Sequence, residues 1–401
     1  MSTFRIPRIG PGALVAAAFI GPGTVTTCTL AGLNYGYALL WALVFATIGT
    51  IVLQEMSARL GTVGRMGLGE AVRRRFPGPL RVAAAVLVAS AIGIGNAAYE
   101  TGNLLGAGLG AQAALGGDIR AWATGIAVLA ALLLWSGSYR AIERVMVGMV
   151  LLMSLVFLVT AISVGAEPGE LLRGATVPAV PPGGALVALG LVGTTIVPYN
   201  LFLHASAARE RFSGDGALNA ARADSVVAIG LGGIVSMSVV VTAAAAAASG
   251  GLGSAANAAE MARQLEPLLG SWARIFFAAG LLAAGLTSAI TAPLAAAYAL
   301  SGVLGWSRDL RDARLRAIWG AVLCSGVFFA LIGVRPVPAI VFAQAANGLL
   351  LPMIALFLLI VMNDRGLLGR AANGWLANTL GVIVVTLAVV LGARAVLGAL
   401  S

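Results

Sequence analysis

The 401-residue sequence contains no lysine, a single histidine and only two cysteines. Charged residues make up 10% of the chain, whereas a soluble domain carries about 25%. A water-facing surface cannot be built from so few charges, so a soluble protein is excluded. Cys28 and Cys324 both lie in apolar stretches, which excludes a disulfide scaffold and zinc-type spacing.

The same scarcity argues against catalysis. A zinc-protease His-Glu-x-x-His motif is impossible with one histidine, and the sequence has neither a Gly-x-Ser-x-Gly elbow nor a P-loop. We therefore expect no enzyme activity and no cofactor.

Long apolar stretches dominate what is present. Hydrophobic residues make up 60% of the chain and the mean hydropathy is +0.98. About 20 residues are needed to cross a membrane as a helix. We predict an all-α integral membrane protein, a single transmembrane domain over residues 1–401. Its eleven expected spans are 10–32, 37–59, 82–108, 121–138, 142–165, 184–206, 224–248, 273–303, 315–333, 337–362 and 374–397.

The net charge of +10 follows from the arrangement of arginines in this topology. With the N-terminus inside, most arginines fall in cytoplasmic segments or adjoining span ends, as the positive-inside rule requires. We therefore expect a multi-pass protein of the cell (inner) membrane, with a cytoplasmic N-terminus and an external C-terminus. Its partner is the lipid bilayer, and no nucleic acid is expected.

Two tetrapeptides interrupt apolar spans: Gly-Pro-Gly-Thr at 21–24 and Val-Pro-Tyr-Asn at 197–200. Proline removes a backbone donor and clashes with the preceding turn, and glycine favours unwinding. Freed backbone groups in hydrocarbon must find protein, water or a ligand. Paired interrupted helices in two halves indicate a transporter's binding site near the bilayer midplane.

The halves are expected at 10–165 and 184–362. Because each contains five spans, an odd number, the second half must be inverted relative to the first. The eleventh span, 374–397, lies outside the repeat.

Four segments resemble helices of the Nramp metal-ion transporters: 10–24 the first helix, 54–61 the second, 197–204 the sixth and 344–352 the tenth. The resemblance runs from about residue 10 to 364. It implies a leucine-transporter-type 5+5 inverted repeat with broken helices 1 and 6. It also implies alternating access and proton-coupled uptake of Mn²⁺ or Fe²⁺.

The sequence departs from that family where the metal would bind. Gly21 stands at the family's metal-binding aspartate and Thr24 at its asparagine. Val197 replaces the metal-contacting methionine, and Tyr199 replaces the adjacent histidine. In the third span, Ala97 replaces an aspartate three positions before a retained glutamate.

Other positions keep the pattern. Asn200 and Gln344 are retained, and Ala18 and Thr194 stand at positions that donate backbone carbonyls in the family. The expected substrate-binding residues are Ala18, Gly21, Gly23, Thr24, Thr194, Val197, Tyr199, Asn200 and Gln344.

This set is neutral and hydrogen-bonding. A dehydrated divalent ion needs negative charge to offset its desolvation, and soft metals favour thioether or imidazole ligands. No metal-ligand residues are therefore expected, and the site suits a small anion or a polar neutral solute better than Mn²⁺ or Fe²⁺. The alternative is a divalent metal-ion transporter (Mn²⁺, Fe²⁺ or hydrated Mg²⁺), proton-coupled as in the family. A transport-dead sensor is a further alternative.

Two titratable residues are candidates for carrying the proton or binding the ion that is coupled to transport. Glu100 lies deep in the third span, where an ionisable group is by default a functional hypothesis. His204, the second histidine of the sixth helix in the family, could relay a proton. For each, a structural hydrogen bond is the competing interpretation.

Overall fold

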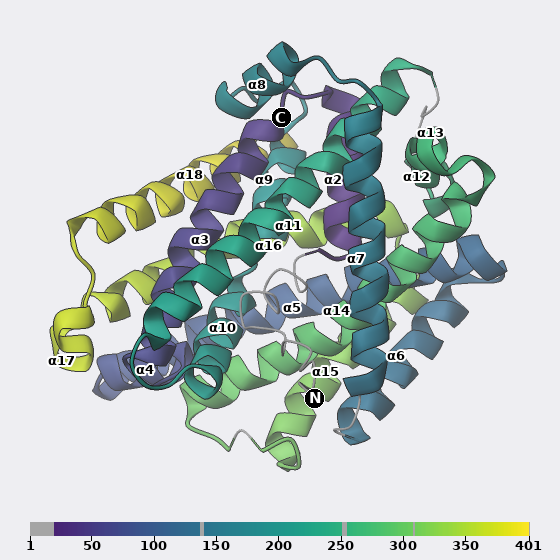
Figure 1. Ribbon diagram of the computed structural model, residues 1–401. Coiled ribbons are helices and arrows are strands. Elements are labelled where there is room, and N and C mark those ends of the chain that lie inside the picture. The colour runs from purple at the N-terminus through teal and green to yellow at the C-terminus, as the bar shows by residue number, and fades with distance from the viewer. Residues whose placement is uncertain (1–19, 137–139, 251–254, 308, 401) are drawn as a thin grey trace, which may run out of the picture.

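The computed structural model describes residues 20–136, 140–250, 255–307 and 309–400. Helices are the only regular elements in these ranges (Figure 1). The longer ones are α2 (Pro22–Tyr35), α3 (Leu40–Thr62), α5 (Gly78–Leu115), α6 (Ile119–Ser136), α7 (Arg140–Ser163), α9 (Ala185–Thr195), α10 (Pro198–Arg211), α11 (Ala217–Ala248), α14 (Ala273–Leu304), α15 (Ala313–Leu331), α16 (Pro336–Met362) and α18 (Trp375–Leu400). The short ones are α4 (Leu68–Arg75), α8 (Pro168–Thr176), α12 (Ala258–Ala262), α13 (Glu266–Leu269) and α17 (Arg365–Leu368).

The predicted membrane fold class is confirmed, but the number of spans stays a prediction. Nine helical segments of the described chain are long and apolar enough to cross a bilayer, α9 and α10 counting as one. The apolar part of α7, Val147–Ser163, is shorter, and α2 has 14 residues.

The sixth span is broken, as the proline at 198 predicts. Helix α9 ends at Thr195, Ile196 and Val197 are non-helical, and α10 begins at Pro198. Pro198 occupies the first position of α10, where its missing N–H costs nothing. Helix α2 begins in the same way, with extended Gly21 followed by Pro22.

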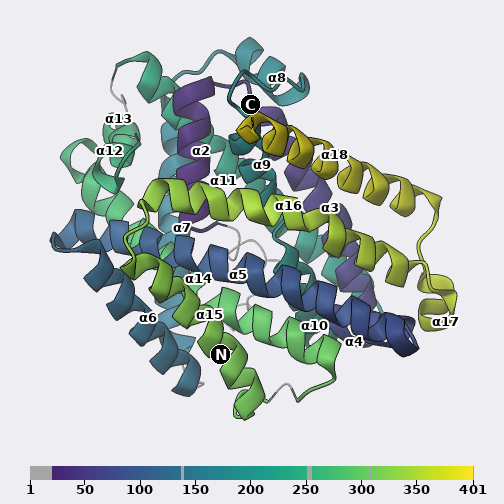
Figure 2. The same cartoon turned by 180° about the vertical axis from the view of Figure 1, so that it is seen from behind.

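Helix α5 crosses the middle of the bundle and packs against α14, α15 and α16 (Figure 2). Small residues allow this approach. A Cβ at Gly285 would press against Ala107 of α5, and one at Gly110 would lie 2.7 Å from the Ala278 carbonyl of α14. Close backbone approach through small residues is typical of membrane helices.

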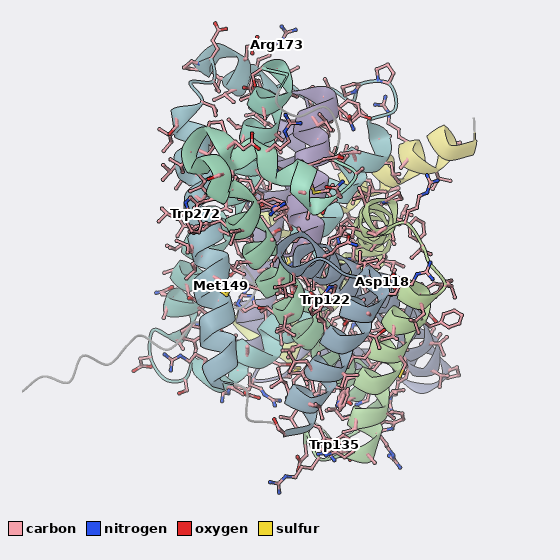
Figure 3. The ribbon with its side chains drawn as sticks, turned by 90° about the vertical axis from the view of Figure 1, so that its right-hand side faces the viewer. Asp118, Trp122, Trp135, Met149, Arg173 and Trp272 are labelled. Atoms are coloured by element: carbon pink, nitrogen blue, oxygen red, sulfur yellow. The ribbon has the colours of Figure 1, made fainter. Side chains whose placement is uncertain are left out.

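Helices α2 and α9 lie side by side, with α11 beside α2 and α16 beside both (Figures 1 and 2). This arrangement brings the start of α2 to the junction of α9 and α10. Two segments expected as plain connections contain helices instead: α4 lies within 60–80 and α8 within 166–183. Arg173 of α8 and Trp135 at the end of α6 mark opposite ends of the bundle (Figure 3).

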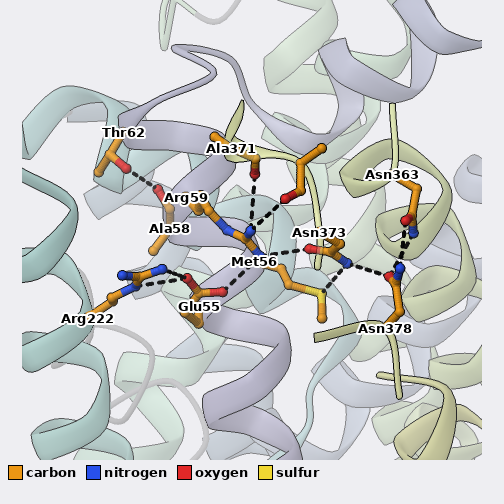
Figure 4. Close-up of polar contacts among 11 residues, drawn as sticks. Glu55, Met56, Ala58, Arg59, Thr62, Arg222, Asn363, Ala371, Asn373 and Asn378 are labelled. Atoms are coloured by element: carbon orange, nitrogen blue, oxygen red, sulfur yellow. Dashed lines mark hydrogen bonds and ion pairs between the residues drawn. The ribbon is translucent and has the colours of Figure 1, made fainter. Parts of the chain in front are cut away.

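A polar network closes the end of the bundle that contains α4 and α17 (Figure 4). Arg59 of α3 donates to Glu55 at 3.1 Å, to the Asn373 side chain at 2.7 Å and to the Ala371 carbonyl at 3.1 Å. Arg222 of α11 donates to the same glutamate at 2.7 Å. The network joins α3, α11 and the segment before α18.

Candidate functional site: the paired helix breaks

The start of α2 and the break between α9 and α10 meet in the protein interior. Thr24, in the first turn of α2, and Thr194, near the end of α9, share a hydrogen bond with their hydroxyl oxygens 2.7 Å apart. Both side chains are buried. The residues are 170 positions apart in the chain, so this contact joins the two predicted halves.

Gly23 faces Gln344 of α16. A Cβ at position 23 would overlap the amide group of Gln344, so only glycine admits this side chain beside the start of α2. Gln344 is buried, and its Oε1 has no hydrogen-bond partner among the described residues.

Gly21 faces α14 and α5. A Cβ at Gly21 would lie 2.9 Å from Ser288 Oγ and 3.8 Å from Tyr99 Oη. The Tyr99 ring meets the Tyr199 ring edge to face, with centroids 5.7 Å apart. Tyr199 and Asn200 form the first turn of α10, so these contacts link α2, α5, α14 and α10 around one point.

Several polar atoms around this point are buried and, within the described ranges, make no hydrogen bond to protein. They are Tyr199 Oη, Asn200 Oδ1 and Nδ2, Ser288 Oγ and Gln344 Oε1. Each unsatisfied buried group costs about 1–3 kcal/mol. Polar atoms left in this way are available to a ligand or its water.

The ends of three helices add both positive and negative dipole ends at this point. Neither α2 nor α10 has a side-chain cap at its start, so each presents the positive end of its helix dipole there. Helix α9 ends at the same junction and presents carbonyl oxygens with a negative dipole end.

The remaining predicted binding residues fall as follows. Val197 is buried at the break and offers no polar side-chain atom. Ala18 lies outside the described residues. No cluster of three or more His, Cys, Asp or Glu side chains that could hold a metal occurs in the described ranges.

Sequence reasoning missed two residues at this point, Tyr99 and Ser288. The available signal for Ser288 was the Thr287-Ser288 pair in the middle of an apolar span. For Tyr99 it was the neighbouring Glu100.

Glu100 directly follows Tyr99 in α5, and His204 lies one turn after Asn200 in α10, and each side chain makes contacts of its own. Glu100 is buried, accepts from Asn103 Nδ2 at 3.2 Å through Oε2, and lies against Gly326 of α15. Its Oε1 has no partner in the described structure. His204 is fully buried between Gln54 Oε1 at 2.8 Å and Ser225 Oγ at 3.3 Å.

A multi-pass helical fold in which an interrupted helix meets the start of another at buried polar groups is typical of a secondary transporter of the leucine-transporter type. Solved structures share this fold. The manganese transporter of Eremococcus coleocola superposes with a TM-score of 0.78 at 22% identity, covering 98% of this chain and 88% of that one. MhsT in complex with L-phenylalanine gives 0.69 at 14% identity, covering 98% of both chains.

The sequence places the chain more narrowly. The family described as natural resistance-associated macrophage protein-like (Nramp) matches residues 12–398. The divalent metal cation transporter MntH of Pectobacterium carotovorum is 29% identical over 390 residues, covering 96% of this chain and 92% of its own. MntH of Klebsiella pneumoniae (strain 342) is 28% identical over 401 residues, covering 99% and 95%.

The chain therefore belongs to the Nramp family and is a membrane transporter, not an enzyme. A small ion fits it as a substrate. The resemblance seen in the sequence is confirmed over nearly the whole chain.

Proposed function

We propose that this protein carries a divalent metal cation that keeps part of its water shell while bound. The proposal replaces the small anion or neutral solute favoured by composition alone, because the relatives most similar in sequence are named divalent metal cation transporters. The single observation that carries it is the group of buried oxygens without protein partners at the helix breaks.

Those oxygens suit a hard cation. Asn200 Oδ1, Gln344 Oε1 and Tyr199 Oη are amide and hydroxyl oxygens, and the end of α9 adds carbonyls. Carbonyl oxygen and water suit Mg²⁺ and Mn²⁺, whereas soft metals favour sulfur and imidazole ligands. Mg²⁺ in particular gives up its water reluctantly and is usually held with several waters retained.

The substitutions Gly21 and Val197 fit this chemistry. Where the family has a carboxylate and a thioether, this chain has a glycine packed closely beside Ser288 and an apolar side chain. Without a fixed negative charge, a fully dehydrated ion would not regain its hydration energy. A hydrated ion makes a smaller demand, so we expect weak affinity and little preference for Fe²⁺.

A small anion is the second candidate, favoured by one observation. The uncapped starts of α2 and α10 both present the positive end of the helix dipole at the junction, which suits an anion. The names of the relatives favour the cation over this candidate.

Proton coupling and the orientation of the chain in the membrane are part of the same proposal. We assign proton coupling to Glu100, whose Oε1 is unpaired, with His204 as a relay held by Gln54 and Ser225. We place the two repeats at 10–165 and 184–362, with the span 374–397 outside them. In a cell membrane of the bacterial inner-membrane type, we place the N-terminus on the cytoplasmic side and the C-terminus on the outer side.

Transport by the purified protein in proteoliposomes tests the proposal. Mg²⁺ and Mn²⁺ uptake are measured beside a panel of small anions, with Asn200→Ala and protein-free vesicles as controls. Saturable cation uptake that is lost in Asn200→Ala supports the cation. Anion flux without cation flux supports the second candidate, and no flux of either kind points to a sensor.

A further inference from the structure

An open apolar groove runs along the outside of the bundle between α5 and α15, with α14 as its floor. Its volume is about 460 Å³. Gly93 and Ala97 of α5 form one wall, Ala317 and Ala321 of α15 form the other, and Ala296 and Leu300 form the floor. The walls are small side chains, so the groove is a consequence of missing volume between neighbouring helices.

The lining of the groove between its mouth and its inner end is almost entirely apolar. Ser325 at its inner end carries the one hydroxyl in the lining, and that hydroxyl donates to the Val322 carbonyl at 2.7 Å. A path for ions or protons needs polar groups that can replace water, and this lining offers none. The groove is therefore separate from the cluster at the helix breaks.

The mouth of the groove is basic and aromatic. Trp306 and Arg314 line it, and the Arg314 guanidinium lies over the Trp306 ring at 5.4 Å from its centroid. The Arg73 guanidinium lies against Gly305, next to Trp306. Neither Arg73 nor Arg314 forms an ion pair with any residue that the structure describes.

The mouth lies at the level where a membrane meets water. The Arg316 guanidinium lies over the Trp135 ring, 4.0 Å from its centroid, two residues after Arg314 in α15, and Trp135 marks this end of the bundle (Figure 3). Tryptophan and arginine gather at membrane interfaces because one part is apolar and the other is wet. From Arg314 to Ser325 the groove follows α15 for about 16 Å, close to one leaflet of a core about 30 Å thick.

We propose that this groove is a binding site for one anionic phospholipid. An acyl chain fills the apolar part between α5 and α15, and the phosphate lies at the mouth beside Arg314 and Arg73. Basic pockets between membrane helices on the cytoplasmic side are suited to such headgroups. Charge complementarity selects an anionic lipid over a zwitterionic one, and the length of the groove fits a chain of the adjacent leaflet.

The test is native mass spectrometry of the full chain from micelles that contain equal amounts of dioleoyl phosphatidylglycerol and dioleoyl phosphatidylcholine. The wild type is expected to retain one phosphatidylglycerol in preference to phosphatidylcholine. Ala321→Phe, which fills the groove, should abolish this retention, and Arg314→Gln should reduce it about fivefold, the effect of one arginine on an anionic surface.

Matched controls come from α18, where Ala393 and Arg394 are exposed and lie away from the groove. Ala393→Phe and Arg394→Gln should retain the lipid as the wild type does. If Ala321→Phe does not fold, as judged by gel filtration, Ala317→Leu takes its place. Equal retention in groove and control variants overturns the proposal, and equal retention of the two lipids overturns the role of the arginines.

Discussion

The hydroxyl groups of Thr24 and Thr194 meet across the two helix breaks at 2.7 Å, inside the protein. Neither residue alone would mark a binding site, because single threonines are common in membrane helices. Their contact places the start of α2 against the end of α9. It therefore fixes the distance between the two half-helix ends that face the proposed substrate.

Removing the Thr24 hydroxyl alone should cost more than removing both hydroxyls. Thr24→Val leaves the buried Thr194 hydroxyl without this partner, a penalty of about 1–3 kcal/mol, whereas the double variant leaves apolar groups on both sides of the contact. We predict that the double variant unfolds at a higher temperature in detergent than the sum of the single losses implies. A double-mutant cycle on melting temperature and on uptake measures the coupling, and strictly additive losses would contradict the bond.

Gly23→Ala should block transport through Gln344. The added Cβ overlaps the Gln344 amide, which must leave its place beside α2. We expect a large loss of uptake with the protein still folded. Gln344→Ala in the same chain should restore packing but not uptake, since the amide oxygen is itself a proposed ligand. Full uptake in Gly23→Ala would show that the amide has no role in binding.

Gly21→Asp combined with Val197→Met should raise the affinity for Mn²⁺. The new carboxylate supplies the charge that a dehydrated ion needs, and the thioether supplies a soft ligand. Space at position 21 is limited by Ser288 Oγ, the movable end of a side chain. Calorimetric titration with Mn²⁺ measures the gain, and Gly21→Asn with Val197→Met is the control with similar shape but no charge. No gain over that control would place the site elsewhere.

Two arginines offer a matched test of the network in Figure 4. Arg59 and Arg74 each pair with a glutamate four residues earlier. The Arg59 side chain is only 9% exposed and donates to three further acceptors, whereas the Arg74 side chain is 54% exposed. Arg59→Gln should cost about 2–4 kcal/mol and Arg74→Gln less than about 0.5 kcal/mol. Melting curves in detergent compare them, and equal shifts would contradict the network's structural role.

Glu100→Gln should uncouple substrate uptake from proton movement. The amide keeps the shape and the bond to Asn103 but cannot carry a proton. We expect substrate-driven acidification of the vesicle lumen to disappear, with uptake of substrate reduced but measurable. A pH-sensitive dye trapped in the vesicles records it. Unchanged acidification would make Glu100 a structural residue, while Asn103→Ala controls for loss of the hydrogen bond alone.

The fold was largely accessible from the sequence because its determinants are local. Apolar length identifies spans, and the proline at 198 identifies the break between α9 and α10, which the structure places within one residue of it. The short helices α4 and α8 were not foreseen. Each has only 8 or 9 residues and a mixed polar character, so neither length nor hydropathy distinguishes it from a loop.

The site was less accessible because it depends on contacts between distant segments. The motifs supplied Thr24, Asn200 and Gln344, but Ser288 reaches the cluster only because α14 packs beside the start of α2. The contact of the Glu100 side chain with Gly326 likewise follows from the face of α5 it occupies, towards α15. Periodicity along one helix does not say which neighbour that face will meet.

The neutral side chains of Asn200 and Gln344 also bear on the energetics of transport across a polarised membrane. One elementary charge crossing 100 mV exchanges about 2.3 kcal/mol with the field. A vacant binding cluster of amides and hydroxyls carries no charge of its own on the return stroke, whereas a bound divalent ion carries two. The membrane potential would then act on the loaded stroke alone and favour entry of the cation, so that accumulation depends on voltage even where no proton gradient exists.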